Sequence, residues 1–280
     1  MAAYPTVSAP YGIKPVNLIG GQVFAGSTRN EPIAYNYGTA IYYGDPVQLS
    51  GGYTILAPGG ASLTGASYVK GTIGIFLGCY YTNPTNKQRQ YAQYYPGNVL
   101  AGDITAIICD DPDTVFKAAV TTAAGSSTIG SASSIIVGQN LAGNTLTGNA
   151  TTGNSNGAIV GSTPATSTGN FRILNLVPDT QISSSATYVS GTGTTTLTVA
   201  GLAVGQVIPI GTDVFNVING QLQFTGSAVT TAATVTSATS QALTVIASAA
   251  TISTTYPLAL VQTPEVLVKI TFGAHRYYVA

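Results

Sequence analysis

Charged side chains are scarce in this sequence. Asp, Glu, Lys and Arg make up 6% of its 280 residues, whereas they make up about a quarter of an ordinary soluble domain. The nine basic and nine acidic residues also cancel, so the chain lacks the long-range field that draws proteins to nucleic acids or anionic membranes. The composition therefore predicts neither a nucleic-acid partner nor a membrane partner.

The same scarcity of charge leaves copies of the chain with little repulsion between them. A net charge near zero promotes association. This favours a protein that works inside an assembly, where most of its surface meets other chains. The alternative is a secreted monomer that Ser, Thr and Asn side chains keep in solution.

Long apolar runs and secretion signals are also missing. No run of about eighteen apolar residues occurs, so we expect no membrane span. The first residues lack the basic and apolar stretches of a signal peptide. The two cysteines, Cys79 and Cys109, lie in apolar runs, where cysteine usually serves as a small buried residue. We expect a reducing compartment, and the sequence leaves open whether the two cysteines pair.

Catalytic motifs are absent as well. The chain has one histidine, His275, with no nucleophile or metal-ligand spacing around it, and no nucleotide-binding or hydrolase motif occurs. The acidic run Asp110-Asp111-Pro112-Asp113 has oxygen ligands that suit calcium, but it lacks the spacing of an EF-hand loop. A turn is the simpler interpretation of this run. We therefore expect neither an enzyme nor a bound cofactor or metal.

Short β-branched and aromatic runs, separated by Gly, Pro, Asn and Asp, predict an all-β fold. The turns Gly51-Gly52 and Asn219-Gly220 predict two hairpins. The only helical expectation is one turn at Asp113–Ala119, with Asp113 as its cap. Outside residues 183–256, the clearest strands are expected at Ala40–Leu49, Tyr53–Leu56, Gly71–Tyr81, Gln88–Tyr95, Ile104–Cys109, Phe171–Val177 and Val266–Phe272. Within residues 183–256 they are expected at Thr194–Val199, Gln206–Ile210, Val214–Ile218, Gln221–Phe224, Ala228–Thr236 and Leu243–Ile246.

Changes in composition divide the chain into four parts. Residues 1–20 predict an extended N-terminal arm, because Pro5, Pro10 and Pro15 oppose helix and central strand. This arm would lie along a neighbouring subunit, with Tyr4 and Tyr11 as anchors, and the alternative is a disordered tail. Residues 21–182 predict a core β-barrel or sandwich domain, in which 121–169 form a loop rich in Ser, Thr, Gly and Asn. Residues 183–256 predict an inserted small β-sandwich-like module, and residues 257–280 supply C-terminal strands that complete the core domain.

Tyrosine is abundant, with 17 residues, while tryptophan is absent. Tyrosine offers a large amphipathic contact area and is enriched at protein interfaces. A tyrosine doublet on a strand places one ring on each face, so at least half of these rings are expected in the core or in subunit contacts. The candidate contact residues are Tyr4, Pro5, Pro10, Tyr11 and Pro15 in the arm, and Tyr42, Tyr43, Tyr94 and Tyr95 in the core domain.

Several motifs resemble a group of virion proteins from tailed phages, many of them from marine and cyanobacterial hosts. The motifs are APYGIKPVNLIGGQVFAGSTRNEPIA, GIFLGCYYTNP, QYAQYYPGN, DDPDTVFKA and VLVKITFGAHRYY. The resemblance covers about Ala9–Val120 and Pro257–Tyr278, with Phe171–Pro178 as a link, and the inserted module departs from it. It is to capsid-associated proteins of the decoration, or cement, type.

The resemblance implies a β-rich protein that is made in the cytoplasm of an infected bacterium and added to the outside of the phage head. It also implies a homotrimer that clamps neighbouring copies of the major capsid protein. The alternatives are a tail fibre or tube component and a host-glycan-binding surface protein. A virion-surface hydrolase is the least favoured, because no pair of carboxylates stands out.

Overall fold

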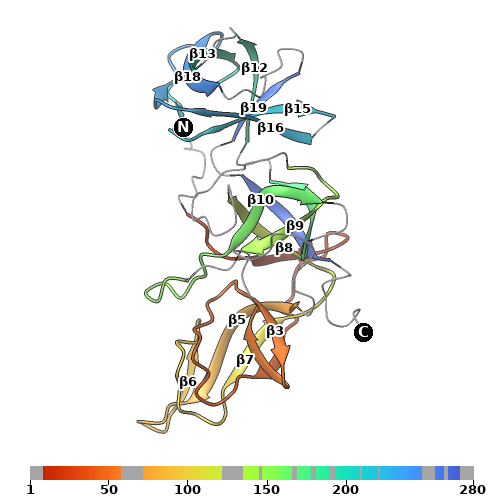
Figure 1. Cartoon of the computed structure of the whole chain (residues 1–280), viewed down its shortest axis with the longest axis vertical. Helices are drawn as coiled ribbons and strands as arrows, with labels where there is room; N and C mark the ends of the chain where they lie inside the picture. Colours follow the sequence, from red (N-terminus) through yellow and green to blue (C-terminus); the bar gives the residue numbers. More distant parts are fainter. Residues whose placement is uncertain are drawn as a thin grey trace.

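The computed structural model contains β-strands and no helix in the residues that it describes, which are 9–57, 72–121, 135–144, 147–165, 169–177, 181–188, 193–208, 210–219, 221–247, 256–261 and 264–271. The prediction of an all-β fold is confirmed. The strands build three units that follow one another along the long axis of the molecule (Figure 1). We call them the sheet unit, the middle barrel and the end barrel.

The sheet unit is an antiparallel sheet of short strands around one long strand, β5. Its order is β2-β7-β5-β3-β4, and β6 also pairs with β5. A bulge at Gly78 bends β5, so that β3 pairs with its first half and β6 with its second half. The strands are β2 (Arg29–Pro32), β3 (Pro46–Ser50), β4 (Tyr53–Leu56), β5 (Thr72–Thr82), β6 (Arg89–Ala92) and β7 (Thr105–Cys109).

The middle barrel closes through the pairing of β8 with β20. Its sheet runs β1-β8-β10-β9-β11-β20, and the additional β8–β20 pairing joins the last strand to the second. One edge of β8 pairs with β1 and then β10, and the other edge pairs with β20. The strands are β1 (Lys14–Leu18), β8 (Thr114–Thr121), β9 (Asn140–Asn144), β10 (Ala158–Ala165), β11 (Phe171–Leu176) and β20 (Glu265–Ile270).

The end barrel is inserted between two paired strands of the middle barrel. It closes in the order β12-β13-β18-β16-β15-β19, with β14 and β17 as a separate two-stranded sheet. The chain leaves and returns at one place, because Leu176 pairs with Val266 and the Val177 amide donates to the Glu265 carbonyl at 3.1 Å. The strands are β12 (Gln181–Tyr188), β13 (Gly193–Ala200), β14 (Val207–Ile208), β15 (Asp213–Ile218), β16 (Gln221–Val229), β17 (Ala233–Thr234), β18 (Gln241–Ala247) and β19 (Leu258–Val261).

Both predicted hairpin turns are observed. Ser50 pairs with Tyr53 across Gly51-Gly52, and both glycines have positive φ. Ile218 pairs with Gln221 across the second turn, where Asn219 has φ 51°. Two-residue turns of this kind match the twist of the flanking strands, which is why these two signals could be read from the sequence.

The predicted helical turn at Asp113–Ala119 is wrong, because these residues enter strand β8. Three strands pair with β8, and its residues Val115, Phe116 and Ala118 are buried. These long-range pairings outweigh a local capping signal. The predicted loop 121–169 is also corrected in part, since β9 and β10 lie within it and close the middle barrel.

The domain boundaries of the structure differ in detail from the predicted ones. The inserted unit runs from Gln181 to Val261, a few residues beyond 183–256 at each end, and it is a closed barrel. The remainder, predicted as one core domain, divides into the sheet unit and the middle barrel, each with its own buried cluster.

The cores of the units touch one another. The middle-barrel cluster includes Ile75 and Cys109 from the sheet unit and Phe215 and Ala259 from the end barrel. Successive residues on β15 point to opposite sides, so Val214 fills the end barrel while Phe215 packs into the middle barrel. Phe215 is therefore the main apolar link between the two barrels.

Replacing Phe215 with Ala should loosen the link between the barrels. We expect the free energy of unfolding to fall by about 3–5 kcal/mol, because a fully buried ring is replaced by a cavity. Urea denaturation measures the change, and Val207→Ala is the control because the Val207 side chain is exposed. A loss below about 1 kcal/mol would show that Phe215 does not couple the barrels.

Candidate functional site

The segment predicted as an arm lies against its own chain from Pro10 onward. Pro10 and Ile13 are buried, and Ile13 belongs to the middle-barrel core. Pro15 pairs with Phe116 at the start of β1, a position where a missing N–H is tolerated. Tyr4 and Pro5 lie outside the described residues. Lys14–Leu18 form strand β1, which pairs with β8 of the middle barrel. From Pro10 onward, therefore, this segment packs on its own chain and does not project from it.

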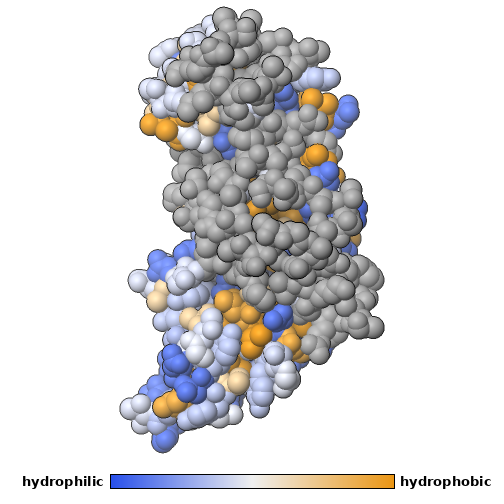
Figure 2. Space-filling view, in the orientation of Figure 1, coloured by the Kyte–Doolittle hydropathy of each residue, from blue (hydrophilic) through white to orange (hydrophobic). Residues whose placement is uncertain are grey.

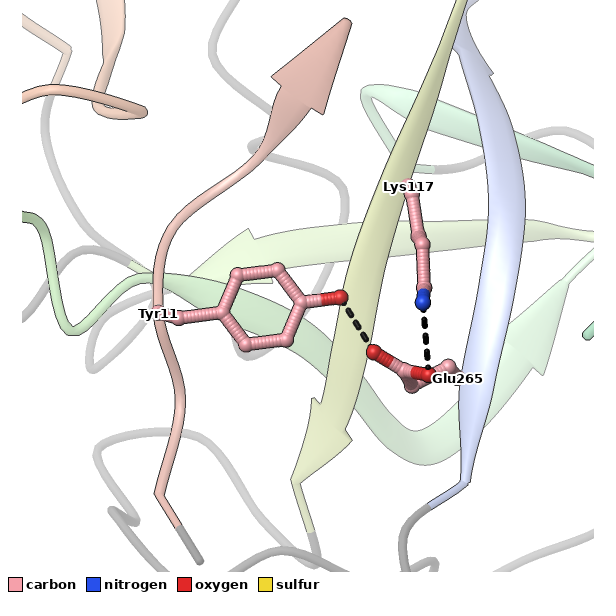
Figure 3. Close-up of polar contacts among 3 residues, drawn as sticks. All are labelled: Tyr11, Lys117 and Glu265. Carbon is pink, nitrogen blue, oxygen red and sulfur yellow. Dashed lines mark hydrogen bonds and ion pairs between the residues drawn. The ribbon is translucent and has the colours of Figure 1, made fainter. Parts of the chain in front are cut away.

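A buried carboxylate holds this segment in place. The Tyr11 hydroxyl donates to Glu265 Oε1 at 2.5 Å, and Lys117 Nζ lies 2.9 Å from Glu265 Oε2. The three side chains converge from the N-terminal segment, β8 and β20 (Figure 3). Burial, together with the Glu265 carboxylate, raises the pKa of the Tyr11 hydroxyl, which therefore stays a donor. Tyr11, predicted to anchor on a neighbouring subunit, makes this bond within its own chain.

Replacing Tyr11 with Phe should weaken the attachment of the N-terminal segment. We expect a loss of about 2 kcal/mol in unfolding free energy, because Glu265 loses one charge-assisted hydrogen bond while staying buried. Chemical denaturation tests this, with Tyr53→Phe on the exposed face of β4 as the control. Equal stability of the Tyr11 variant and the natural chain would remove this bond from the account.

A second buried carboxylate joins the sheet unit to the middle barrel. Asp45 is 1% exposed. Its Oδ1 accepts from the Ser155 hydroxyl at 2.5 Å and its Oδ2 accepts from the Tyr42 amide at 2.8 Å. Ser155 Oγ in turn accepts from the Gly157 amide at 2.7 Å. Because Ser155 lies just before β10 and Asp45 just before β3, these bonds connect the two units.

Backbone hydrogen bonds beside two glycines support the same joint, and the bond from Ile13 to Gly44 crosses between the units. The Gly12 amide donates to the Gly157 carbonyl, and the Ile13 amide donates to the Gly44 carbonyl, both at 3.0 Å. Gly12 and Gly44 have φ of 87° and 95°. A Cβ on Gly44 would lie 2.9 Å from the Ile13 nitrogen, so only glycine allows this approach. We call the set of Gly12, Gly44, Asp45 and Ser155 the Asp45 joint.

The Asp45 joint should make stability depend on pH. Burial raises the pKa of the Asp45 carboxyl from 3.8 to about 6. The folded state thus prefers the protonated form, so the stability contributed by Asp45 is fully present below about pH 4 and is lost as pH rises through 6. The loss amounts to about 3 kcal/mol.

Asp45→Asn tests this, because an amide stays uncharged at every pH. We expect the stability of the natural chain, relative to that of the variant, to fall between pH 4 and pH 7. Urea denaturation at several pH values gives the difference. Asp113→Asn is the control, since the Asp113 side chain is exposed. A difference that stays constant with pH would contradict the assignment.

The predicted contact tyrosines of the sheet unit pack mainly within the chain. Tyr95 is fully buried and its hydroxyl donates to the Tyr37 carbonyl at 2.7 Å, so it offers no surface to a partner. Tyr42 is 8% exposed and stacks on the half-buried Tyr94 with ring centroids 5.2 Å apart. Tyr43 is half-buried beside Lys14. In the three doublets that the structure describes, one ring is buried and the other is partly exposed. A role in subunit contact stays a prediction for Tyr43 and Tyr94.

The acidic run after β7 forms a turn, as predicted. Asp111 Oδ1 accepts from the Asp113 amide at 2.9 Å, and Asp110 forms an ion pair with Arg29 at 2.7 Å. No group of three or more His, Cys, Asp or Glu side chains gathers as a metal site within the described part of the chain. Both Cys79 and Cys109 are buried free thiols, and burial raises the pKa of each, to about 12 and about 11.

The tip of the β5–β6 hairpin is an exposed cluster that sequence reasoning did not single out. The Arg89 guanidinium lies over the Tyr80 ring at 4.2 Å from its centroid and near the Tyr91 ring at 5.7 Å. Tyr91 is 68% exposed. Tyr80 and Tyr91 are paired across the two strands. To predict this cluster from the sequence one would need the register of the hairpin, and the pattern of residues alone does not determine that register.

The described residues bring together no set of side chains that matches a catalytic site, and His275 lies outside them. They also include no helix with the length and apolar character needed to cross a membrane. No known protein family, curated protein or solved structure matches this chain. The resemblance to phage virion proteins therefore stays a prediction, and the function is argued from the distribution of charge and contacts.

Proposed function

We propose that this protein is a virion structural protein that binds the outside of a phage head and stabilises the lattice of the major capsid protein. The observation that carries the proposal is the uneven distribution of charge along the molecule. Between Gln181 and Val261 the end barrel has one charged residue, Asp213, which is 7% exposed. The sheet unit and the middle barrel hold nearly all the other charges.

This distribution suits a molecule with two different ends. A surface of neutral Ser and Thr side chains can coat a particle without attracting ions, nucleic acid or charged neighbours. The other end offers charged and aromatic groups, which give a protein interface its orientation and its strongest contacts. In the proposal, the sheet unit binds the capsid and the end barrel points away from it.

The contacts between units support a mechanical role. Buried cores and the Asp45 joint connect the three units, so a load on one unit passes to the next. A cement protein of this kind would bury its docking end across neighbouring capsid subunits and raise the barrier to their separation. The homotrimer that the sequence resemblance implies would place three such contacts around one axis.

A peptide tag tests the proposed orientation. Inserted at the Asn219-Gly220 turn of the end barrel, an epitope should bind its antibody on intact heads that carry the protein. The same epitope inserted at the Gly51-Gly52 turn of the sheet unit should be hidden until the heads are disrupted. Electron microscopy with gold-labelled antibody measures both. Exposure of the sheet-unit tag together with masking of the end-barrel tag would contradict the proposal.

A shorter truncation than the sequence suggested tests the arm. Removal of residues 2–20 would delete Ile13 and β1, which are parts of the middle barrel. Removal of residues 2–8 spares both, so we expect an unchanged melting temperature and a loss of co-sedimentation with heads. Full binding by the chain that lacks residues 2–8 would remove the arm from the docking surface.

A further inference from the structure

The β5–β6 tip is built to present one arginine. The Asn83 amide donates to the Gln88 carbonyl at 2.8 Å and the Lys87 amide donates to the Asn83 carbonyl at 2.9 Å, which closes the turn. Asn83 Nδ2 also donates to Gln90 Oε1 at 3.1 Å. A second brace comes from Asp103, whose carboxylate accepts from the Thr82 amide and, at 2.6 Å, from the Thr82 hydroxyl.

The guanidinium of Arg89 is held over a ring, and its donors have no hydrogen-bond partner among the described residues. Its central carbon lies 4.2 Å from the centroid of the Tyr80 ring, and a guanidinium that lies over a ring still has its N–H donors for other partners. No described residue accepts a hydrogen bond from Arg89 or lies within ion-pair distance of it. Asp103 is near enough for the Arg89 charge to add to the Thr82 hydrogen bonds that lower the pKa of its carboxyl. The nearby cation Lys87 is exposed and has no ion-pair partner in the described ranges either.

We infer that the tip formed by Tyr80, Lys87, Arg89 and Tyr91 is a docking site for a carboxylate-bearing protein loop. A planar guanidinium with free donors binds a carboxylate through two parallel hydrogen bonds. The stacked rings fix its position beforehand, which lowers the entropy cost of binding. Arginine and tyrosine are also the residues on which interface energy usually concentrates.

The position of the tip suggests its partner, and this step rests on the proposed function. Figure 1 places β6 at the end of the molecule opposite the end barrel, and Figure 2 shows hydrophilic residues gathered at that end. A protein that binds the capsid by this end would set Arg89 against an acidic loop of the capsid subunit. A nucleic-acid partner is disfavoured, because two cations on a neutral chain neutralise too few phosphates.

Binding to immobilised poly-L-glutamate tests the tip without any capsid. We expect the natural chain to bind at low salt and Arg89→Gln to bind roughly tenfold more weakly, since a charge-assisted pair is lost. Arg89→Lys should recover only part of the affinity, because it restores the charge but not the planar group. The matched control is Arg172→Gln, an exposed arginine on the middle barrel. No binding by the natural chain, equal binding by Arg89→Gln, or tighter Arg89-dependent binding to duplex DNA would overturn the inference.

Co-sedimentation with phage heads separates this inference from the proposed function. If the natural chain does not bind heads, the proposed function fails, while the poly-L-glutamate result still decides the chemistry of the tip. If the natural chain and Arg89→Gln bind heads equally, the proposed function stands and the capsid is excluded as the partner of Arg89. Loss of head binding by Arg89→Gln alone, with Arg172→Gln unchanged, supports both.

Discussion

The arrangement of this molecule depends on a carboxylate that is buried between two units and has no ion-pair partner in the part of the chain that the structure describes. Asp45 has Ser155 and the Tyr42 amide as its partners, and neither carries a charge. Burying a carboxyl group costs free energy unless hydrogen bonds compensate, so the joint is stable only in one close geometry. Gly12 and Gly44 permit that geometry because neither brings a Cβ into the contact. The joint therefore fixes the sheet unit on the middle barrel.

A different interaction fixes the other end. Phe215 and Ala259 pack into the middle-barrel core. Apolar contacts have no preferred direction, so this contact tolerates small shifts better than a hydrogen-bonded carboxyl does. The end barrel also enters and leaves through the neighbouring residues Val177 and Glu265. The molecule thus combines a tightly specified joint near the proposed docking end with an inserted barrel at the neutral end. That division suits the proposed function, in which the docking end keeps a fixed orientation and the neutral end faces away from the capsid.

The sequence predicted well those features that neighbouring residues decide. Strand β4 and the turns at Gly51-Gly52 and Asn219-Gly220 follow from local patterns. Strand β8 was missed because Asp113, just before it, resembles a helix cap and so predicted a helical turn. The three strands that pair with β8 are distant in the sequence, and no local pattern indicates them. Strands β9 and β10 were missed because buried Leu141 and Ile159 stand among Ser, Thr, Gly and Asn.

The side chains of the site were harder to predict than the strands, because they meet across long separations. Asp45 and Ser155 are 110 residues apart, and Tyr11 and Glu265 are 254 residues apart. Each is an ordinary polar residue in the sequence, and only the closed barrel brings them together. The Tyr80–Arg89–Tyr91 cluster depends in the same way on the register of one hairpin.

Cryo-electron microscopy of the assembled virion tests the central claim most directly. The account predicts density for the three units on the outer surface of the head, with the sheet unit against the major capsid protein and the end barrel pointing outward. Density for the chain on the tail, or an end barrel seated on the capsid lattice, would contradict it.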